Sequence, residues 1–178
     1  QDPLPLMALE INGHPVEFIL DTGGDRLIID ETVAERVGVD VLATTTAKYA
    51  FTGGEDVRRD LGRVESVEMG AVTLKNVPVV VLPWKANGPQ SDGVVTTGVL
   101  RQFLSTVDYA NDRLVFREKS EAGKQRLLAL LEGHETVVMP FVLNATHLLF
   151  AQGSLDGHEN LTYLVDSGLA MSLPFISV

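Results

Sequence analysis

Short apolar segments, separated by turns that contain glycine and asparagine, follow one another along most of this chain. Segments of this length between turn residues are typical of β-strands. The pattern predicts strands at 7–11, 16–20, 27–29, 64–69, 72–74, 77–82, 106–109 and 113–116, and again at 137–139, 141–143 and 147–150. The sequence therefore predicts an all-β protein.

Helical patterns are confined to a few short stretches. Asp30 is placed to cap one short helix, and a second helix or turn is predicted at 101–104. The segment 119–131 is amphipathic and ends before Gly133. Its leucines are expected to pack in the interior, with a partner-binding helix as the alternative.

Two stretches have no strong apolar pattern. Residues 44–60 are polar, with Gly53-Gly54 at their centre. Glycine permits backbone conformations that other residues resist, so we expect an exposed hairpin with a mobile tip. The stretch 84–93 is predicted to be a loop.

One pattern occurs twice: a hairpin turn, an apolar strand, and an acid followed by a hydroxyl and a glycine. The first copy runs from the turn at 12–13 to Asp21-Thr22-Gly23. The second, one residue longer, runs from 156–157 to Asp166-Ser167-Gly168. The end of an apolar strand is a costly place for a charge. The repeat therefore suggests a carboxylate pair, brought together by two similar lobes.

Such a pair has a defined chemistry. Two carboxylates about 3 Å apart cannot both ionise, so Asp21 and Asp166 would share a proton. The charged member can activate a water as general base, while the protonated one assists a carbonyl as general acid. The glycines let the backbones approach, and the hydroxyls of Thr22 and Ser167 can hold the acids in place. The alternative is that each Asp merely caps a turn.

These residues resemble the pepsin/retropepsin aspartic peptidase superfamily. Residues 18–25, Phe-Ile-Leu-Asp-Thr-Gly-Gly-Asp, are similar to the retropepsin loop Leu-Leu-Asp-Thr-Gly-Ala-Asp, with Gly24 replacing the alanine. Residues 99–104 resemble the Ile-Gly-Arg-Asn/Asp-Leu-Leu segment on a short helix, with Leu100 replacing the glycine. The resemblance implies a retropepsin-like β-barrel lobe with short helices, and a dyad at the interface between two lobes.

The same resemblance assigns further site residues. It places a flap over the cleft, formed by Tyr49, Phe51, Gly53 and Gly54. Asp166-Ser167-Gly168 is similar to the C-terminal motif of pepsin-like and bacterial two-lobed members.

An ion pair is also implied behind the active-site loop. Asp25 and Arg101 stand at the family's acid and arginine positions, and we predict that they pair. Arg26 is the competitor, but adjacent residues of a strand point to opposite faces.

The domain organisation follows from the repeat. We predict a complete lobe at 1–118, an amphipathic linker at 119–134 and the start of a second, truncated lobe at 135–178. The chain is then a fragment of a longer two-lobed protein, or the remainder was lost. A further alternative is a homodimer that pairs two copies of Asp21.

Composition narrows the function classes. A net charge of −10 and scattered basic residues argue against a nucleic-acid partner. No apolar run reaches the roughly 20 residues of a membrane span. The chain has no cysteine, and its histidines lack metal-ligand spacing, so no cofactor or metal is expected. A periplasmic or secreted location is favoured over a cytoplasmic one.

The function predicted from these residues is that of an aspartic endopeptidase acting on a peptide or protein. The alternative is a non-catalytic retropepsin-like module for binding or dimerisation.

Overall fold

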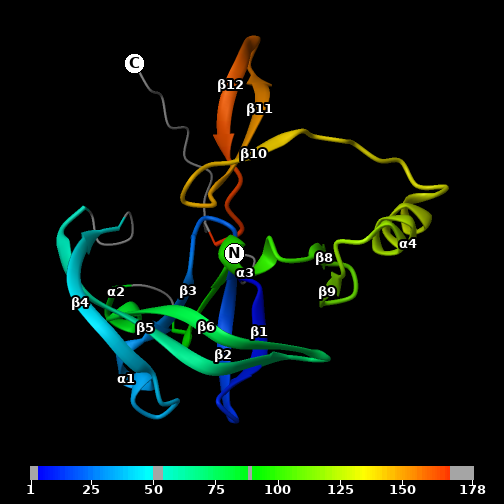
Figure 1. The fold of residues 1–178 in the computed structure, drawn as a ribbon. Helices are drawn as coiled ribbons and strands as arrows, with labels where there is room; N and C mark the ends of the chain where they lie inside the picture. Colours follow the sequence, from blue (N-terminus) through cyan, green and yellow to red (C-terminus); the bar gives the residue numbers. More distant parts are fainter. Residues whose placement is uncertain (1–3, 50–53, 88–89, 169–178) are drawn as a thin grey trace.

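The computed structural model of the protein describes residues 4–49, 54–87 and 90–168 (Figure 1). Strands dominate these ranges, and the helices are short, so the predicted all-β class is confirmed. None of the helices in the described ranges is long and apolar enough to cross a bilayer.

A β-barrel forms the first part of the chain. Its sheet has the order β1-β2-β7-β3-β6-β5-β4, and an extra pairing of β1 with β5 closes a ring of six strands. The strands β2 and β7 run parallel, as do β3 and β6. The strand bounds are β1 Leu6–Ile11, β2 His14–Asp21, β3 Leu27–Asp30, β4 Asp40–Lys48, β5 Asp56–Met69, β6 Val72–Leu82 and β7 Gly93–Thr96.

Two buried clusters fill the barrel and its flank. The larger joins Phe18 and Leu20 of β2 to residues of β1, β3, β5 and β6. The smaller contains Ile19, Ile28 and Val94, and Tyr49 of the β4–β5 hairpin packs against it. Because alternate side chains of a strand point to opposite faces, β2 contributes to both clusters.

Three helices of a single turn each connect strands of the barrel or follow them. The helix α1 (Glu31–Ala34) begins after Asp30, whose carboxylate caps it as predicted. The helix α2 (Trp84–Asn87) lies in the segment predicted to be a loop. The helix α3 (Thr97–Leu100) precedes the predicted 101–104, because the Thr96 hydroxyl accepts a hydrogen bond from the Gly98 amide and starts it early.

The second part of the chain is less well packed. A hairpin of β8 (Leu104–Asp108) and β9 (Arg113–Arg117) leads to α4 (Glu121–Leu131). A three-stranded sheet follows, made of β10 (Phe141–Leu143), β11 (Leu149–Leu155) and β12 (His158–Leu164).

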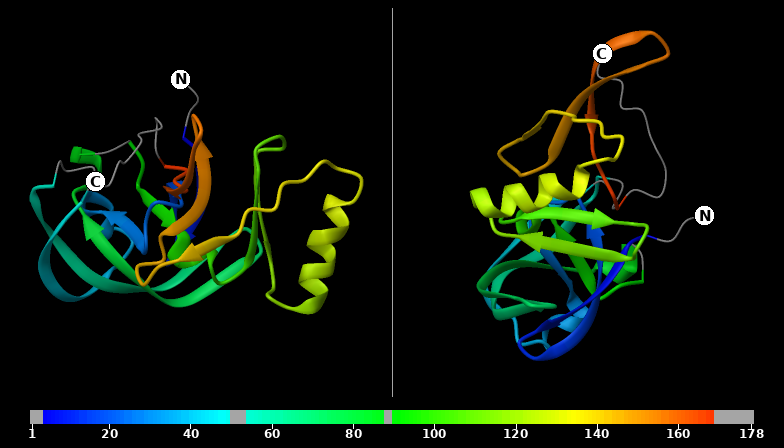
Figure 2. Two further views of the ribbon diagram at one scale, coloured as in Figure 1. Left: turned by 90° about the horizontal axis from the view of Figure 1, so that it is seen from above. Right: turned by 90° about the vertical axis from the view of Figure 1, so that its right-hand side faces the viewer.

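The prediction that the α4 leucines are interior is wrong. Figure 2 shows α4 beyond the β8–β9 hairpin, away from the barrel. Leu130 is 56% exposed, Leu128 and Leu131 are exposed as well, and the buried residue of the helix is Gly123. The strand predicted at 137–139 does not form either, and Val137 is 91% exposed. The amphipathic pattern correctly predicted a helix, but it did not show whether another part of the protein covers the apolar face of that helix.

The internal repeat is visible in the backbone. Both hairpin turns have an Asn or Asp and then a glycine at positive φ: Asn12 and Gly13 at 51° and 78°, Asp156 and Gly157 at 49° and 80°. These are the values of a tight two-residue hairpin turn. The extra residue of the second copy lies in a β-bulge, where the register shifts and Asn160 takes a φ of 60°.

Candidate active site

The loops that follow β2 and β12 meet near the centre of the molecule (Figure 1). Each strand is fixed by an equivalent backbone hydrogen bond just before its acid. The Leu20 amide donates to the Pro5 carbonyl at 2.8 Å, and the Val165 amide donates to the Leu149 carbonyl at 2.9 Å. The two copies of the repeat therefore present their acids in the same local setting.

Crossed hydrogen bonds join the two loops that follow. The Thr22 hydroxyl donates to the Val165 carbonyl at 2.7 Å, and the Ser167 hydroxyl donates to the Leu20 carbonyl at 3.0 Å. In return, the Ser167 amide donates to the Thr22 hydroxyl at 2.9 Å, and the Thr22 amide donates to the Ser167 hydroxyl at 3.1 Å. Each hydroxyl is thus both donor and acceptor, and the arrangement is nearly twofold symmetric.

The carboxyl groups of Asp21 and Asp166 lie together inside this frame. The Gly23 amide donates to Asp21 at 2.6 Å, and the Gly168 amide donates to Asp166 at 2.9 Å. A Cβ at Gly23 would collide with the Asp166 carboxyl, and a Cβ at Gly168 would collide with that of Asp21. Glycine is therefore required at both positions because each backs the opposite acid.

Burial and the neighbouring acid shift the protonation of this pair. Burial, the charge of Asp166 and a hydrogen bond with Asp166 raise the pKa of Asp21 to about 7. Hydrogen bonds from the Gly23 and Gly168 amides act in the opposite direction and are outweighed. At neutral pH Asp21 can therefore hold a proton that an isolated carboxyl group would have lost.

The first acid is supported by β7 and α3. Thr96, fully buried, stands beside Asp21 in the parallel pairing of β2 with β7. The Thr97 hydroxyl donates to the Gly24 carbonyl. A Cβ at Gly98 would strike the backbone of Asp25, so α3 packs directly on the active-site loop. In the described ranges no strand flanks β12 in the way that β7 flanks β2.

The predicted ion pair between Asp25 and Arg101 is absent from the described part of the chain. Asp25 instead lies 3.7 Å from the Nε atom of Arg26, and Arg101 is exposed. Residues 25 and 26 form a bend before β3, so the rule that neighbouring strand residues face apart does not apply to them. The loop and α3 do meet, but through Thr97 and Gly98.

The predicted flap lies partly outside the described residues, since Phe51 and Gly53 are among those not described. Tyr49 and Gly54 flank the tip of the β4–β5 hairpin, and the Gly54 amide donates to the Tyr49 carbonyl at 3.3 Å. Gly54 has a φ of +83°, as a turn glycine does.

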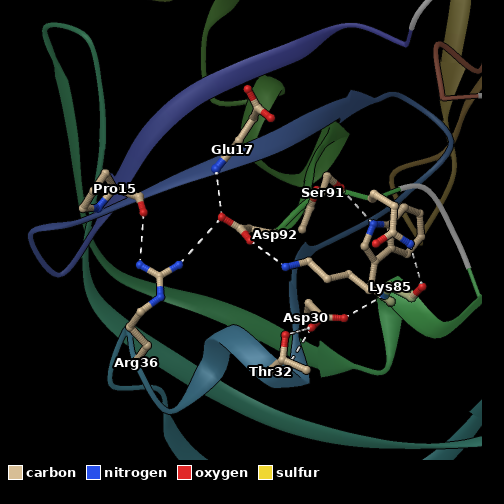
Figure 3. Close-up of polar contacts among 11 residues, drawn as sticks. Pro15, Glu17, Asp30, Thr32, Arg36, Lys85, Ser91 and Asp92 are labelled. Atoms are coloured by element: carbon tan, nitrogen blue, oxygen red, sulfur yellow. Dashed lines mark hydrogen bonds and ion pairs between the residues drawn. The ribbon is translucent and has the colours of Figure 1, made fainter.

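A polar network missed by the sequence analysis holds the start of β7 (Figure 3). The Asp92 carboxylate accepts from Lys85 at 2.8 Å and from the Glu17 amide at 3.2 Å, and Arg36 lies 3.7 Å away. Asp92 therefore links α2 and the segment after α1 to β2, the strand that carries Asp21. Its position in a predicted loop gave no signal of this role.

Comparison with known proteins identifies the fold. The model of the aspartyl protease family matches residues 7–100, more than half of the chain. The chain belongs to the aspartyl protease family. This membership confirms the predicted superfamily, and together with the closed barrel it confirms the retropepsin-like fold class. No curated protein matches the chain.

Solved structures of similar proteins include other retropepsin-like chains. A retropepsin-like aspartic protease from Rickettsia conorii is 17% identical, with a TM-score of 0.44 over 58% of this chain and 74% of its own. The retroviral protease-like domain of Ddi1 from Leishmania major is 18% identical, with a TM-score of 0.45 over 65% and 90%. EIAV protease in complex with the inhibitor HBY-793 is 16% identical, with a TM-score of 0.43 over 56% and 88%.

Proposed function

We propose that this family member is an aspartic endopeptidase whose catalytic dyad is Asp21 and Asp166 of one chain. The observation that carries the proposal is the mutual packing of the two acids, each against the glycine that follows the other. A turn-capping role would require neither this proximity nor the crossed hydrogen bonds of Thr22 and Ser167.

The reaction follows from the shared proton. A water between the carboxyls attacks the scissile carbonyl carbon, and the ionised carboxylate takes its proton. The protonated carboxyl gives its proton to the carbonyl oxygen, forming a tetrahedral diol. The acid that took the proton of the water then passes it to the amide nitrogen, while the other acid takes a proton from a diol hydroxyl, so the carbon–nitrogen bond breaks and two peptides are released. No covalent intermediate with the enzyme forms, and both acids regain their starting protonation.

The test is a pair of substitutions at the dyad. We expect Asp21→Asn and Asp166→Asn each to lower hydrolysis of an unstructured protein by about a thousandfold or more, because the acids act as a unit. Asp156→Asn, at the exposed turn of the second hairpin, is the matched control and should remain active. Pepstatin-type transition-state mimics should inhibit the wild type, and EDTA should not.

The same experiment separates the alternatives. A homodimer that pairs two Asp21 residues would keep its activity in Asp166→Asn. A non-catalytic binding module would show no hydrolysis in the wild type under any condition. The crossed bonds between residues of one chain favour the Asp21/Asp166 dyad over both.

The remaining assignments are extensions of this proposal. Substrates are peptides or unfolded proteins, and the flap stays a prediction from the sequence. The division into a lobe at 1–118, a linker at 119–134 and a second lobe from 135 stays a prediction, as does a periplasmic or secreted location.

A further inference from the structure

The inner face of the β4–β5 hairpin carries an arginine that no acid of the described residues neutralises. Arg59 lies on β5, opposite Thr45 of β4. Its neighbours two positions away, Val57 and Leu61, both pack against the smaller buried cluster. Because side chains alternate along a strand, Arg59 points to that same inner side.

The contacts of Arg59 leave one edge of the guanidinium unused. Its Nη1 atom donates to the Tyr49 hydroxyl at 3.3 Å. Its Nε atom is buried and has no hydrogen-bond partner among the described residues. The adjacent Arg58 is different, because it is exposed and pairs with Asp60 at 2.9 Å. Arg59 forms no ion pair with any acid in the described ranges, although the chain has a net charge of −10.

The cluster beneath Arg59 leads to the dyad. It contains Ile19, which precedes Asp21 by two residues on β2 and therefore shares its face. The hairpin that carries Arg59 and the strand that ends at Asp21 therefore pack on the same cluster. A peptide that reaches the dyad beneath the hairpin passes this cation.

A partly buried guanidinium without an ion-pair partner among the described residues is suited to bind a planar anion. The edge that bears Nε is covered in this structure, so a carboxylate reaches it only when the hairpin shifts to admit a peptide. There the guanidinium can donate two parallel hydrogen bonds to the carboxylate, a geometry that a lysine cannot supply. Tyr49 holds the opposite edge through Nη1, which fixes the orientation of the group. We propose that Arg59 is a specificity-determining residue that selects substrates with an Asp or Glu side chain close to the scissile bond. This inference rests on the proposed peptidase function.

The test is a positional peptide library in which Glu, Gln or Lys occupies each position around the cleavage site. At one position the wild type should prefer Glu to Gln by about tenfold to hundredfold in kcat/KM, the range of a charged hydrogen bond. Arg59→Gln should lose that preference, so that its kcat/KM values for the Glu and Gln peptides become similar. Arg59→Glu should prefer Lys at the same position.

Two further variants guard against misfolding and general charge effects. Arg59→Lys keeps the charge but cannot donate two parallel hydrogen bonds, so its preference for Glu should be intermediate. Arg58→Gln removes an adjacent outward cation and should keep the wild-type preference. The inference is overturned if the wild type has no acidic preference at any position, or if the preference survives in Arg59→Gln.

Binding separates this inference from the proposed function. The same peptides are titrated against Asp21→Asn protein with and without Arg59→Gln. If the Glu peptide binds selectively through Arg59 but the wild type hydrolyses nothing, the peptidase proposal is wrong and the acidic specificity stands. If the wild type hydrolyses peptides without any acidic selectivity, the peptidase proposal stands and the specificity is wrong. If neither hydrolysis nor selective binding is found, both proposals are wrong.

Discussion

Asp21 and Asp30 both terminate apolar strands, yet their protonation differs. Burial would raise the pKa of Asp30, but hydrogen bonds from the Lys85 amide and from Thr32 outweigh it, and the pKa lies below its usual value. Asp21 has fewer donors and faces a second acid, so its pKa rises. The surrounding donors and acids, rather than the strand end itself, decide whether the pKa of such an acid falls or rises.

The raised pKa of Asp21 predicts how stability depends on pH. Its pKa is 3.8 in the unfolded chain and about 7 in the folded one, so the folded state binds more protons between these values. The contribution of Asp21 to stability is therefore full below pH 3.8 and is lost as the pH rises through 7. We expect wild type to lose stability relative to Asp21→Asn between pH 4 and pH 7.5.

Thermal unfolding of both proteins at the two pH values measures this change. Titrating groups that lie away from the two acids are common to both proteins and cancel in the difference. A difference in stability that is the same at both pH values would show that the Asp21 carboxyl is not perturbed. Hydrolysis should also decline as the pH rises past 7, because the dyad then loses its shared proton.

At the scale of elements, the Thr22 hydroxyl connects β2 to β12. Thr22→Val would leave the Val165 carbonyl and the Ser167 amide without their partner, at a cost of about 1–3 kcal/mol. We expect it to lower peptidase activity and to speed hydrogen exchange in β12. Thr22→Ser keeps the hydroxyl and is the matched control. Equal exchange rates in the two variants would contradict a docking role for this hydroxyl.

The Asp92 network predicts that a partly buried ion pair contributes more to stability than an exposed one. Asp92 and Lys85 are both mostly buried, so Asp92→Asn should destabilise the fold by about 1–3 kcal/mol. Asp40 and Arg63 form an ion pair with similar geometry, but both side chains are 56% exposed, so Asp40→Asn should cost about 0–1 kcal/mol. Denaturant unfolding of both variants measures the two effects. Equal losses would show that the Asp92 network does not anchor β7.

Local chemistry explains which parts of the site could be predicted from the sequence. The hairpin turns and both Asp-hydroxyl-glycine loops depend on residues adjacent in the chain, so their pattern located the two acids before any coordinates. The support of the loop by Gly98 depends on close approach of distant backbones, and no periodicity encodes it. The prediction of an Asp25–Arg101 ion pair was wrong because residues 25 and 26 form a bend where a strand was assumed.

At the scale of the whole molecule, packing is uneven. The barrel holds nearly all of the buried apolar residues, whereas β10 and the segment before it leave Val138, Phe141 and Val142 exposed. Few buried contacts imply a low free energy of local opening. We expect backbone amides of β10–β12 to exchange with solvent faster than those of β2 and β7. Exchange measured by mass spectrometry tests this, and equal protection of the two sheets would contradict it.

The β-bulge at Asn160 has a consequence for how the two halves can diverge. One added residue in a strand turns every later side chain to the opposite face of the sheet. The bulge absorbs the added residue before the strand reaches Asp166, so the second acid still faces the first. The second hairpin therefore carries one residue more than the first, while its acid keeps the same orientation toward its partner.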